Sequence, residues 1–263
     1  NNKAIGVKMT DGKVFSAKNV ISGAGVMTTY NKLISKEIVE KHKLKSQLKT
    51  VKRSVSHACL YIGLKGSPEE LNLPKTNYWI YPEKIDHDTA INNYLKDLNQ
   101  DFPVVYISFP SAKDSDWSNR YPGKSTIDII TLLPYEPFNK WNGSRWMKRE
   151  KEYNDLKEKI AQRLLKELFK HIPQVEGNIE HYELSTPLTT QHFINYEEGE
   201  IYGLDHTPKR FRQRFLKPRT PIKNFYLTGQ DIVTAGVAAA LFSGVITTST
   251  ITKKNIIKKI IKN

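Results

Sequence analysis

The chain has 263 residues, of which 41 are Lys or Arg and 27 are Asp or Glu, so its formal net charge is +14. Hydrophobic residues make up 38% of the sequence, which is enough for a folded core and excludes a mainly disordered chain. The length predicts one or two domains. The single cysteine, Cys59, has no partner in the chain, so a disulfide framework is excluded and a reducing, intracellular compartment is expected.

The basic charge attracts phosphate groups of any kind and does not by itself select a partner. Basic residues concentrate in three stretches, Lys41–Lys52, Lys209–Arg219 and Lys253–Lys262. A solvated basic face is the favoured interpretation of each. Because no zinc-knuckle or helix-turn-helix spacing accompanies them, the sequence predicts no binding to nucleic acid.

The first elements predicted are a β-hairpin and a further strand. Alternating residues over Ala4–Met9 and Val14–Ala17 flank Thr10–Lys13, where Asp-Gly supplies the positive φ angles of a tight turn. The β-branched run Asn19–Ile21 predicts the next strand. The glycine-rich corner Ser22–Gly25 follows it and leads into a helix.

The middle of the chain predicts a sheet joined by substantial loops. Helical spacing over Thr28–Lys41 precedes it. Five prolines between Pro74 and Pro122 punctuate the region, which favours a mixed or antiparallel sheet. The strands expected are Ser54–Leu64, Asn77–Tyr81, Phe102–Phe109, Ser125–Leu133 and, further on, Glu180–Leu184.

The clearest amphipathic helix is predicted over Ser144–His171, where apolar residues recur at intervals of three and four. Ser144 is a suitable N-cap, and Pro173 lies where a proline stop is expected. The segment Ser185–Phe215 is rich in Thr, Gly, Pro and charged residues. It is expected to form a long folded loop, a kind of segment that is often functional.

The last part of the chain predicts a short strand over Asn224–Leu227, a turn over Thr228–Asp231 and then a helix. The run Ile232–Thr252 carries no charge and is long enough to span a membrane. Its many small and hydroxylated residues favour a helix buried within the protein instead. The tail after it sets four isoleucines opposite lysines, so it could touch an anionic membrane, with a solvated basic end as the equal alternative.

One arrangement near the C-terminus points to chemistry. A strand that leads to Gly229, followed by an acid and by a helix beginning near Gly236, has the layout of an anion-binding corner. Backbone N–H groups at a helix N-terminus are unpaired and carry partial positive charge, which suits a phosphate or a negative charge on a ring. The small residues Ala238–Ala240 let a flat ligand approach the backbone. Close packing of two helices is the competing interpretation.

Three stretches resemble one family of flavoproteins. NFYLTGQDIVTAGVAAALFSGV, residues 224–245, looks like the C-terminal flavin-contacting signature of FAD-dependent oxidoreductases that include phytoene desaturases, carotenoid isomerases and retinol 13,14-reductases, also called retinol saturases. STPLTTQHFINYEEGEIYGLDHTPKRF, residues 185–211, is similar to a second signature, closest to the retinol saturase branch. GVKMTDGKVFSAKNVISGAG, residues 6–25, is similar to that family's hairpin and returning strand.

The family opens with a strand and a G-x-G-x-x-G turn that holds the FAD pyrophosphate, and this sequence contains no such element. It also begins without an initiator Met. The resemblance therefore implies a C-terminal portion, cut within the cofactor domain, with the missing N-terminal half as a partner. It implies an α/β fold, mixed with α+β features. A partial Rossmann-like FAD-binding domain would comprise residues 1–25 and 221–252, a substrate-binding domain with a mixed β-sheet and packed helices residues 26–220, and a basic tail residues 253–263.

The resemblance implies that nine residues contact FAD. Asp231 would accept hydrogen bonds from cofactor hydroxyls, with a helix cap as its structural alternative. The helix start would face the flavin pyrimidine edge, where the dipole favours the anionic reduced ring. The glycine-rich corner would line the opposite side or form only a structural turn. The cofactor-binding residues expected are Gly229, Gln230, Asp231, Gly236, Val237, Ala238, Ser22, Gly23 and Ala24.

The resemblance also implies that six residues lie near a substrate tunnel. The alternative is that these residues only pack within an ordinary loop. These are Thr189, Thr190, Gln191, His192, Tyr202 and Gly203. His192 and His206 are conceivable proton donors, but nothing in their spacing singles out either, so no catalytic residue is assigned. No metal-ligand spacing is present, and no metal is expected.

These inferences favour a C-terminal fragment of a flavin-dependent oxidoreductase that saturates, desaturates or isomerises a retinol-like or carotenoid-like polyene or isoprenoid lipid. FAD would be bound in the full-length protein and absent from, or weakly held by, the fragment, which is expected to be inactive alone. A cytoplasmic protein peripheral to an anionic membrane is expected. The alternative is a non-enzymatic basic module that binds lipid or a membrane surface without a cofactor.

Overall fold

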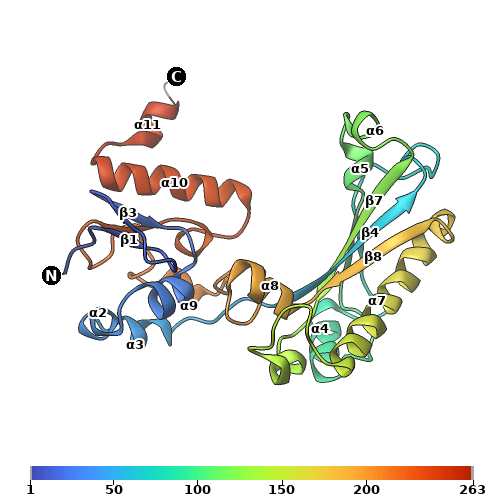
Figure 1. Cartoon of the computed structure of the whole chain (residues 1–263), viewed down its shortest axis with the longest axis horizontal. Coiled ribbons are helices and arrows are strands. Elements are labelled where there is room, and N and C mark those ends of the chain that lie inside the picture. Colours follow the sequence, from blue (N-terminus) through green and yellow to red (C-terminus); the bar gives the residue numbers. More distant parts are fainter. Residues whose placement is uncertain (1, 262–263) are drawn as a thin grey trace. The chain divides into compact units, whose positions relative to one another are not determined.

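The computed structural model describes residues 2–261. They fall into two compact units, one formed by the residues up to Ser54 together with those from Asn195 on, and one by Val55–Ile194 (Figure 1). The strands are β1 (Gly6–Lys8), β2 (Val14–Ser16), β3 (Val20–Ser22), β4 (His57–Lys65), β5 (Tyr78–Ile80), β6 (Val105–Ser108), β7 (Lys124–Leu132), β8 (Ile179–Ser185) and β9 (Phe225–Leu227).

The α-helices are α1 (Val26–Thr28), α2 (Lys36–Lys41), α3 (Leu44–Leu48), α4 (His87–Lys96), α5 (Pro110–Lys113), α6 (Trp117–Arg120), α7 (Lys151–His171), α8 (Pro187–Ile194), α9 (Pro208–Phe211), α10 (Val237–Thr252) and α11 (Ile256–Ile261). A π-helical turn η1 (Thr29–Leu33) and the 3-10 turns η2 (Glu136–Trp141), η3 (Pro173–Val175) and η4 (Gln230–Ile232) complete them. The predicted α/β fold with mixed features is confirmed.

Two small sheets form the unit built from the chain ends. β1 and β2 pair antiparallel around the expected Asp-Gly turn, in which Lys13 N donates to Asp11 Oδ1 at 3.0 Å. β3 and β9 pair in parallel, with Val20 opposite Phe225. Parallel strands need a long crossover connection, and here that connection contains the whole second unit. The hairpin and both further strands were predicted from the sequence.

The core of this unit joins β3 and β9 to the helical segment that follows β3. Val26, Tyr30 and Leu44 are each at most 2% exposed and pack in one cluster with Leu227. The sequence predicted a single helix over Thr28–Lys41, whereas the structure has α1, η1 and α2, with α3 beyond. The single-helix prediction is wrong because the backbone is extended at Ile34 and Ser35, which separates η1 from α2.

The unit boundaries lie further inside the chain than the sequence suggested. The units divide after Ser54 and after Ile194, not after Gly25 and before Pro221. The physical reason is packing, because residues of α1–α3 and of the segment containing Leu204 share one hydrophobic cluster with β3 and β9. Both chain ends nevertheless belong to one unit and the middle to the other.

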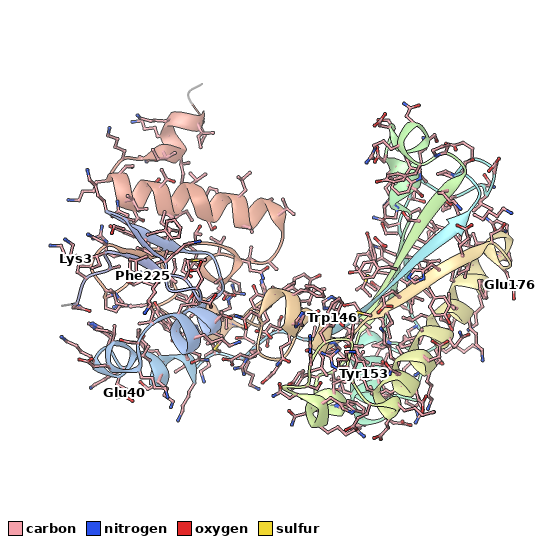
Figure 2. All side chains as sticks on the ribbon, in the orientation of Figure 1. Lys3, Glu40, Trp146, Tyr153, Glu176 and Phe225 are labelled. Atoms are coloured by element: carbon pink, nitrogen blue, oxygen red, sulfur yellow. The ribbon has the colours of Figure 1, made fainter. Side chains whose placement is uncertain are left out.

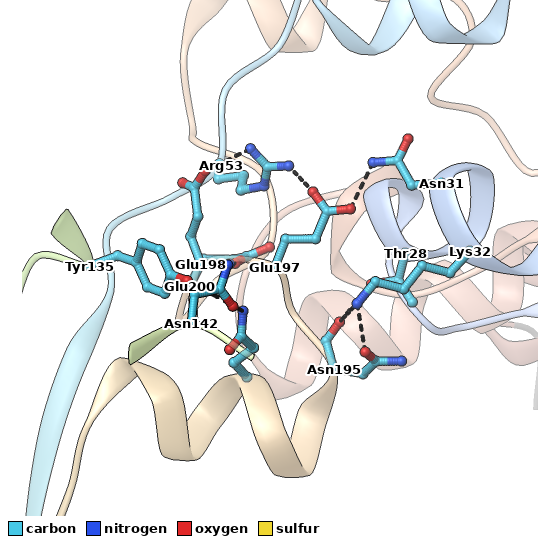
Figure 3. A network of polar contacts seen from close by, with 11 residues as sticks. Thr28, Asn31, Lys32, Arg53, Tyr135, Asn142, Asn195, Glu197, Glu198 and Glu200 are labelled. Carbon is cyan, nitrogen blue, oxygen red and sulfur yellow. Dashed lines mark hydrogen bonds and ion pairs between the residues drawn. The ribbon is translucent and has the colours of Figure 1, made fainter. Parts of the chain in front are cut away.

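Within the unit formed by the chain ends, polar contacts also attach the segment from Asn195 on to the residues before Ser54 (Figure 3). Arg53 forms ion pairs with Glu197 and with Glu198, the latter at 2.9 Å between Nη1 and Oε1. Lys32 Nζ donates to Asn195 Oδ1 at 2.6 Å. Because these side chains are partly solvent-exposed, each pair contributes only about 0–1 kcal/mol, so the network mainly orients the segment.

A five-stranded antiparallel sheet in the order β5-β6-β7-β4-β8 forms the second unit. α7 runs along one face of this sheet (Figure 1), where Leu164 and Leu168 pack with Leu60 and Ile129. All four are fully buried. Tyr153 on α7 and Phe225 on β9, both labelled in Figure 2, belong to the two separate cores. All five strands were predicted, and the sheet is purely antiparallel.

α7 begins at Lys151, seven residues after the start that the spacing predicted. Glu150 occupies the N-cap position. Ser144 is not the cap, because its Oγ donates to Trp141 O at 2.5 Å and accepts a hydrogen bond from Arg149 Nε at 3.1 Å in the preceding loop. The helix ends at His171, two residues before Pro173, as predicted.

The segment Ser185–Phe215 is not the continuous loop expected. α8 and α9 lie within it, and each begins with a proline, a residue tolerated in the first turn of a helix. Thr207 Oγ1 caps α9 by accepting a hydrogen bond from Arg210 N at 3.2 Å. The sequence did not reveal either helix, because Thr, Gly and Pro in this segment have low intrinsic helix propensity.

α10 is not the buried helix that was expected. Only Ser243 and Thr247 on it are buried, while Val237 is 89% exposed and Leu241 is 75% exposed. Its hydroxylated face packs against the protein, and its apolar face is open. Across residues 2–261, no helix combines the length and the apolar character that crossing a bilayer requires.

Leu164→Ala is expected to lower the free energy of unfolding by about 2–5 kcal/mol, because it leaves a cavity between α7 and the sheet. Urea denaturation followed by far-UV circular dichroism measures this loss. Leu95→Ala, at a half-exposed position on α4, is the matched control and should cost less than about 1 kcal/mol. Equal losses in the two variants would contradict the packing described.

Candidate functional site at the end of the parallel strands

β3 and β9 end side by side, and each strand leads into a glycine turn. Ser22 lies opposite Leu227, and Thr228 N donates to Ser22 O at 2.9 Å. Gly23 and Gly229 follow. A Cβ added at Gly229 would have only Gly23 O within 4 Å, at 3.9 Å. The carboxyl edge of the sheet therefore presents bare backbone, and this edge is where open α/β sheets bind ligands.

Hydroxyl groups attach α10 to this edge. Ser243 Oγ accepts a hydrogen bond from Gly229 N at 2.7 Å and lies 3.1 Å from Thr228 Oγ1. One turn further, Thr247 Oγ1 donates to Leu227 O at 3.0 Å. The small hydroxylated residues of this helix thus satisfy backbone groups at the strand end, which explains why they dilute its apolar character.

The first turn of α10 is open. Its N-cap, Gly236, has φ 102° and ψ 160°, a conformation that is essentially restricted to glycine, and no side chain caps the helix. A Cβ at Gly236 would meet nothing within 4 Å. Val237 and Ala238 follow in the exposed turn. Its unpaired N–H groups carry the partial positive charge of a helix start and can receive an anion or an electron-rich ring edge.

Asp231 connects three segments of the chain. Its side chain is buried, with Oδ2 accepting a hydrogen bond from Val26 N at 2.7 Å and Oδ1 accepting one from Leu204 N at 2.9 Å. Because Val26 is the first residue of α1, the carboxylate caps that helix and favours its dipole. The helix-cap interpretation of Asp231 is therefore present in the structure, at α1 rather than α10.

Two glycines permit this close approach to Asp231. A Cβ at Gly203 would lie 2.3 Å from Asp231 Oδ1, and a Cβ at Gly25 would lie 2.9 Å from Tyr196 Cε1. Both glycines have positive φ angles, 65° and 80°. Gln230 Nε2 donates to Tyr196 Oη at 3.1 Å, so the predicted Gln230 also faces this cluster.

Arg210 holds the same corner from inside the protein, and sequence reasoning missed it. The side chain is 2% exposed, with Nη1 donating to Leu204 O at 3.0 Å and Nη2 donating to Gln230 O at 2.6 Å. Burial lowers the pKa of its guanidinium, and the nearby Asp231 opposes that shift. It lies in the basic stretch that was interpreted as a solvated face, and no sequence signal distinguishes it from its exposed neighbours.

His206 positions the chain just before α10. Its Nε2 accepts a hydrogen bond from Ala235 N at 2.8 Å, so this nitrogen carries no proton. Burial lowers the pKa of the imidazole, and the Arg210 charge lowers it further. The neutral ring is therefore favoured, which weakens the hypothesis that His206 donates a proton.

Ser22, Gly23 and Ala24 line a cavity of about 650 Å³ together with the hairpin residues Ile5 and Val7. Ser22 Oγ also lies 2.7 Å from Thr29 Oγ1 at the start of the helical segment. Gly229, Gln230 and Asp231 do not line this cavity. The structure thus divides the predicted cofactor residues between a cavity beside β3 and the open start of α10.

The six predicted substrate residues fall in different units. Tyr202 and Gly203 lie in the unit of the chain ends, where Tyr202 N donates to Ser54 Oγ at 2.9 Å. The other four lie on α8 in the second unit and make local contacts there. Thr189 contacts Thr186, Thr190 is buried, Gln191 Nε2 donates to Asn142 Oδ1 at 3.2 Å, and His192 stacks on Trp146 with ring centroids 5.3 Å apart.

Titratable side chains offer no metal centre in the part of the chain that the structure describes. No group of three or more His, Cys, Asp or Glu residues there could hold a metal ion. The site is therefore a backbone-lined corner, whose chemistry depends on glycine turns and a helix start.

Comparison with known proteins identifies the family. No family model matches the chain. It is 36% identical over 264 residues to the all-trans-retinol 13,14-reductase of Danio rerio, covering 97% of this chain and 43% of that protein. It is 28% identical over 247 residues to the chloroplastic prolycopene isomerase of Arabidopsis thaliana, covering 93% and 38%. A crystal structure of an oxidoreductase from Methanosarcina mazei matches with a TM-score of 0.47 at 15% identity, covering 97% of this chain and 47% of that one.

The fold and the site define an α/β protein with a glycine-lined corner at the carboxyl edge of parallel strands. The chain belongs to the family that contains all-trans-retinol 13,14-reductases and prolycopene isomerases, as its sequence motifs suggested. It spans about two fifths of the length of these curated relatives.

Asp231→Ala is expected to lower the free energy of unfolding by about 2–5 kcal/mol, because it leaves the N–H groups of Val26 and Leu204 buried without their acceptor. Thermal and urea unfolding measure the loss. Glu40→Ala, at an exposed position on α2, is the control and should stay within about 0.5 kcal/mol of the parent. If Asp231→Ala also changes the free energy of unfolding by no more than about 0.5 kcal/mol, Asp231 does not connect the three segments as described.

Proposed function

We propose that this chain forms part of an FAD-dependent oxidoreductase that acts on carbon–carbon double bonds of a polyene or isoprenoid lipid. The observation that carries the proposal is the similarity to all-trans-retinol 13,14-reductase along 97% of the chain. The prolycopene isomerases support the same class of substrate, because their name also refers to a conjugated polyene.

The open corner has features that suit a flavin. The first turn of α10 offers unpaired N–H groups to a ring that becomes negatively charged on reduction. Gly229 and Gly236 leave the backbone bare, so that a planar group can approach it. FAD, when bound, supplies the transfer of a hydride equivalent. The chain itself would position the flavin and the substrate, exclude water from them and stabilise the negative charge of the reduced ring.

Three side chains hold this corner in place. Ser243 fixes Gly229, His206 fixes Ala235, and Arg210 fixes Gln230. Each donor or acceptor is satisfied within the protein and leaves the N–H groups of α10 for a ligand. These three are therefore positioning residues.

We further infer that another polypeptide segment completes the unit of the chain ends. Parallel sheets are normally covered on both faces, yet Ile21 on β3 is 50% exposed and the apolar face of α10 is open. The cavity beside β3 is lined by apolar residues of β1 and β3. The part of the relatives' length that this chain does not span is the source proposed for that segment.

A module that binds a membrane surface without a cofactor is the second candidate. α11 exposes Ile260 at 58% and Ile261 at 78% beside its lysines, and the whole chain carries a charge of +14. An amphipathic basic helix of this kind binds anionic lipid surfaces. The same feature would also let an enzyme dock peripherally on the membrane that holds its substrate.

The purified 263-residue chain is expected to be colourless or nearly so. The physical reason is that the cavity beside β3 is incomplete without the complementing segment. Co-expression with a segment that corresponds to the rest of the relatives' length should give a yellow complex with about one flavin per chain, measured by visible absorbance. If the 263-residue chain alone carries about one flavin per chain, the complementing segment is not needed for FAD binding. If the co-expressed complex is colourless, the membrane-binding module without a cofactor is favoured.

Gly236→Leu in the completed protein is expected to abolish retention of FAD with little loss of secondary structure. A leucine there would place its side chain over the open helix start and strain the backbone. Gly177→Leu is the matched control, because Gly177 also has a positive φ, 87°, and no atom within 4 Å of an added Cβ. Flavin content after gel filtration is the readout, and normal retention in Gly236→Leu would locate the flavin elsewhere.

A further inference from the structure

Four exposed apolar side chains cluster on the surface of the second unit. Trp146 (labelled in Figure 2) and Met147 lie in the loop before α7, and Phe193 and Ile194 end α8. Their exposed fractions are 39%, 76%, 63% and 58%, in that order. The Trp146 and Phe193 rings meet edge to face with their centroids 5.1 Å apart, so two distant segments form one surface, called here the Trp146 patch. Contiguous exposed apolar surface rimmed by polar residues marks an interaction site.

A tight turn presents Trp146 and Met147 at its centre. Lys148 N donates to Arg145 O at 3.1 Å, which closes the turn around the two apolar residues. Met147 has φ 59°, a left-handed conformation that favours Gly or Asn at the third position of a turn. A long apolar side chain at this position strains the backbone and, being exposed, gains little from the core. The strain therefore points to a contact outside the chain.

The base of this loop is attached to the core. His192 stacks on the Trp146 ring with centroids 5.3 Å apart and an interplanar angle of 13°. Arg149, directly after the turn, donates from Nε to Ser144 Oγ at 3.1 Å and from Nη1 to Tyr153 Oη at 3.2 Å. Tyr153 is 4% exposed and belongs to the core of the second unit. The apolar tip is thus held in a defined place while it stays open to solvent.

Basic side chains flank the patch. Arg145 and Lys148, the first and last residues of the turn, are exposed, and within residues 2–261 neither forms an ion pair. The nearby Lys140 and Lys151, in contrast, each pair with a carboxylate. α8, which supplies the rest of the patch, contains no Asp or Glu. The patch therefore combines an apolar tip with two uncompensated positive charges.

We propose that the Trp146 patch docks the second unit on the surface of an anionic lipid bilayer. Trp146, Met147 and Phe193 would enter the interfacial region, where the amphipathic indole of Trp is favoured. Arg145 and Lys148 would remain at the level of the lipid phosphates and bind them. This surface is separate from α11, which belongs to the other unit. The proposal does not rest on the flavin or on the polyene class of the proposed function.

Another polypeptide is the competing occupant of such a surface. A stable protein interface usually involves about 20–30 residues on each side, whereas the patch has four apolar residues at the tip of a turn and the end of a helix. Lysine is also depleted in protein interfaces, while unpaired Lys and Arg beside an aromatic tip are suited to lipid phosphates. Both features favour the bilayer.

The test is cosedimentation of the 263-residue chain with vesicles of phosphatidylcholine, with or without phosphatidylserine. All proteins compared carry Ile260→Ser and Ile261→Ser, so that α11 does not contribute. This background protein is expected to bind the vesicles that contain phosphatidylserine, and added salt should weaken the binding. Arg145→Gln combined with Lys148→Gln should weaken it roughly tenfold or more, because two contacts with lipid phosphates are lost.

Met147→Gly separates docking from folding. It should weaken vesicle binding roughly tenfold, because the apolar side chain is lost, yet leave the stability to urea unchanged or higher, because Gly suits the positive φ. Trp79→Ser is the control, since Trp79 is 61% exposed on β5 outside the patch, and it should leave vesicle binding unchanged. Equal vesicle binding by Met147→Gly and the background protein would overturn the proposal.

Quenching of tryptophan fluorescence by brominated phosphatidylcholine in the same vesicles reports which ring enters the bilayer. Trp146→Phe should keep most of the binding and lose most of the quenching, whereas Trp79→Phe should lose none. Equal quenching in these two variants, or no vesicle binding by the background protein, would also overturn the proposal. Binding that disappears on co-expression with the complementing segment would show that the patch is a protein interface instead. Flavin content is a separate readout, so each of these failures leaves the oxidoreductase proposal intact.

Discussion

The carboxylate of Asp231 is the contact on which the glycine-lined corner depends. One oxygen receives the N–H at the start of α1, and the other receives the N–H of Leu204 from the returning chain. Without this bridge, the turn after β9, the helix after β3 and the segment from Asn195 on have no common polar anchor. Arg210 completes the arrangement by binding the carbonyl oxygens of Leu204 and Gln230. The two charges balance each other within a buried, low-dielectric environment, where a lone charge would be costly.

This anchoring has a consequence for α10. Because hydroxyl groups of Ser243 and Thr247 hold the helix to the strand end, its first turn needs no capping side chain to stay in place. The N–H groups of that turn are therefore left for a ligand. The opposite, apolar face of the helix is exposed, with Val237 at 89% and Leu241 at 75%. Rigid positioning and an open face thus arise from the same helix.

Sequence reasoning succeeded where a pattern has a local physical cause. Alternation and an Asp-Gly turn give the β1–β2 hairpin, and a proline stop gives the end of α7. It failed where tertiary contacts override local preference. The apparent helical spacing from Trp146 is interrupted because Ser144 Oγ donates to the Trp141 carbonyl and Arg149 Nε donates to the Ser144 hydroxyl instead. The charge-free run near the C-terminus does not become a buried helix, since only one face of it meets the protein.

The amino-acid sequence by itself determined the strands, the main helix of the second unit, the family motifs and the glycines at which the backbone must turn. Those features follow from side-chain periodicity and from conformations that only certain residues adopt. Only the tertiary structure decided that both chain ends share one core, that Arg210 is buried while its basic neighbours are solvated, and that α10 leaves its apolar residues Val237 and Leu241 exposed. The reason is that burial and charge compensation depend on contacts between residues far apart in the chain, which composition and spacing do not encode.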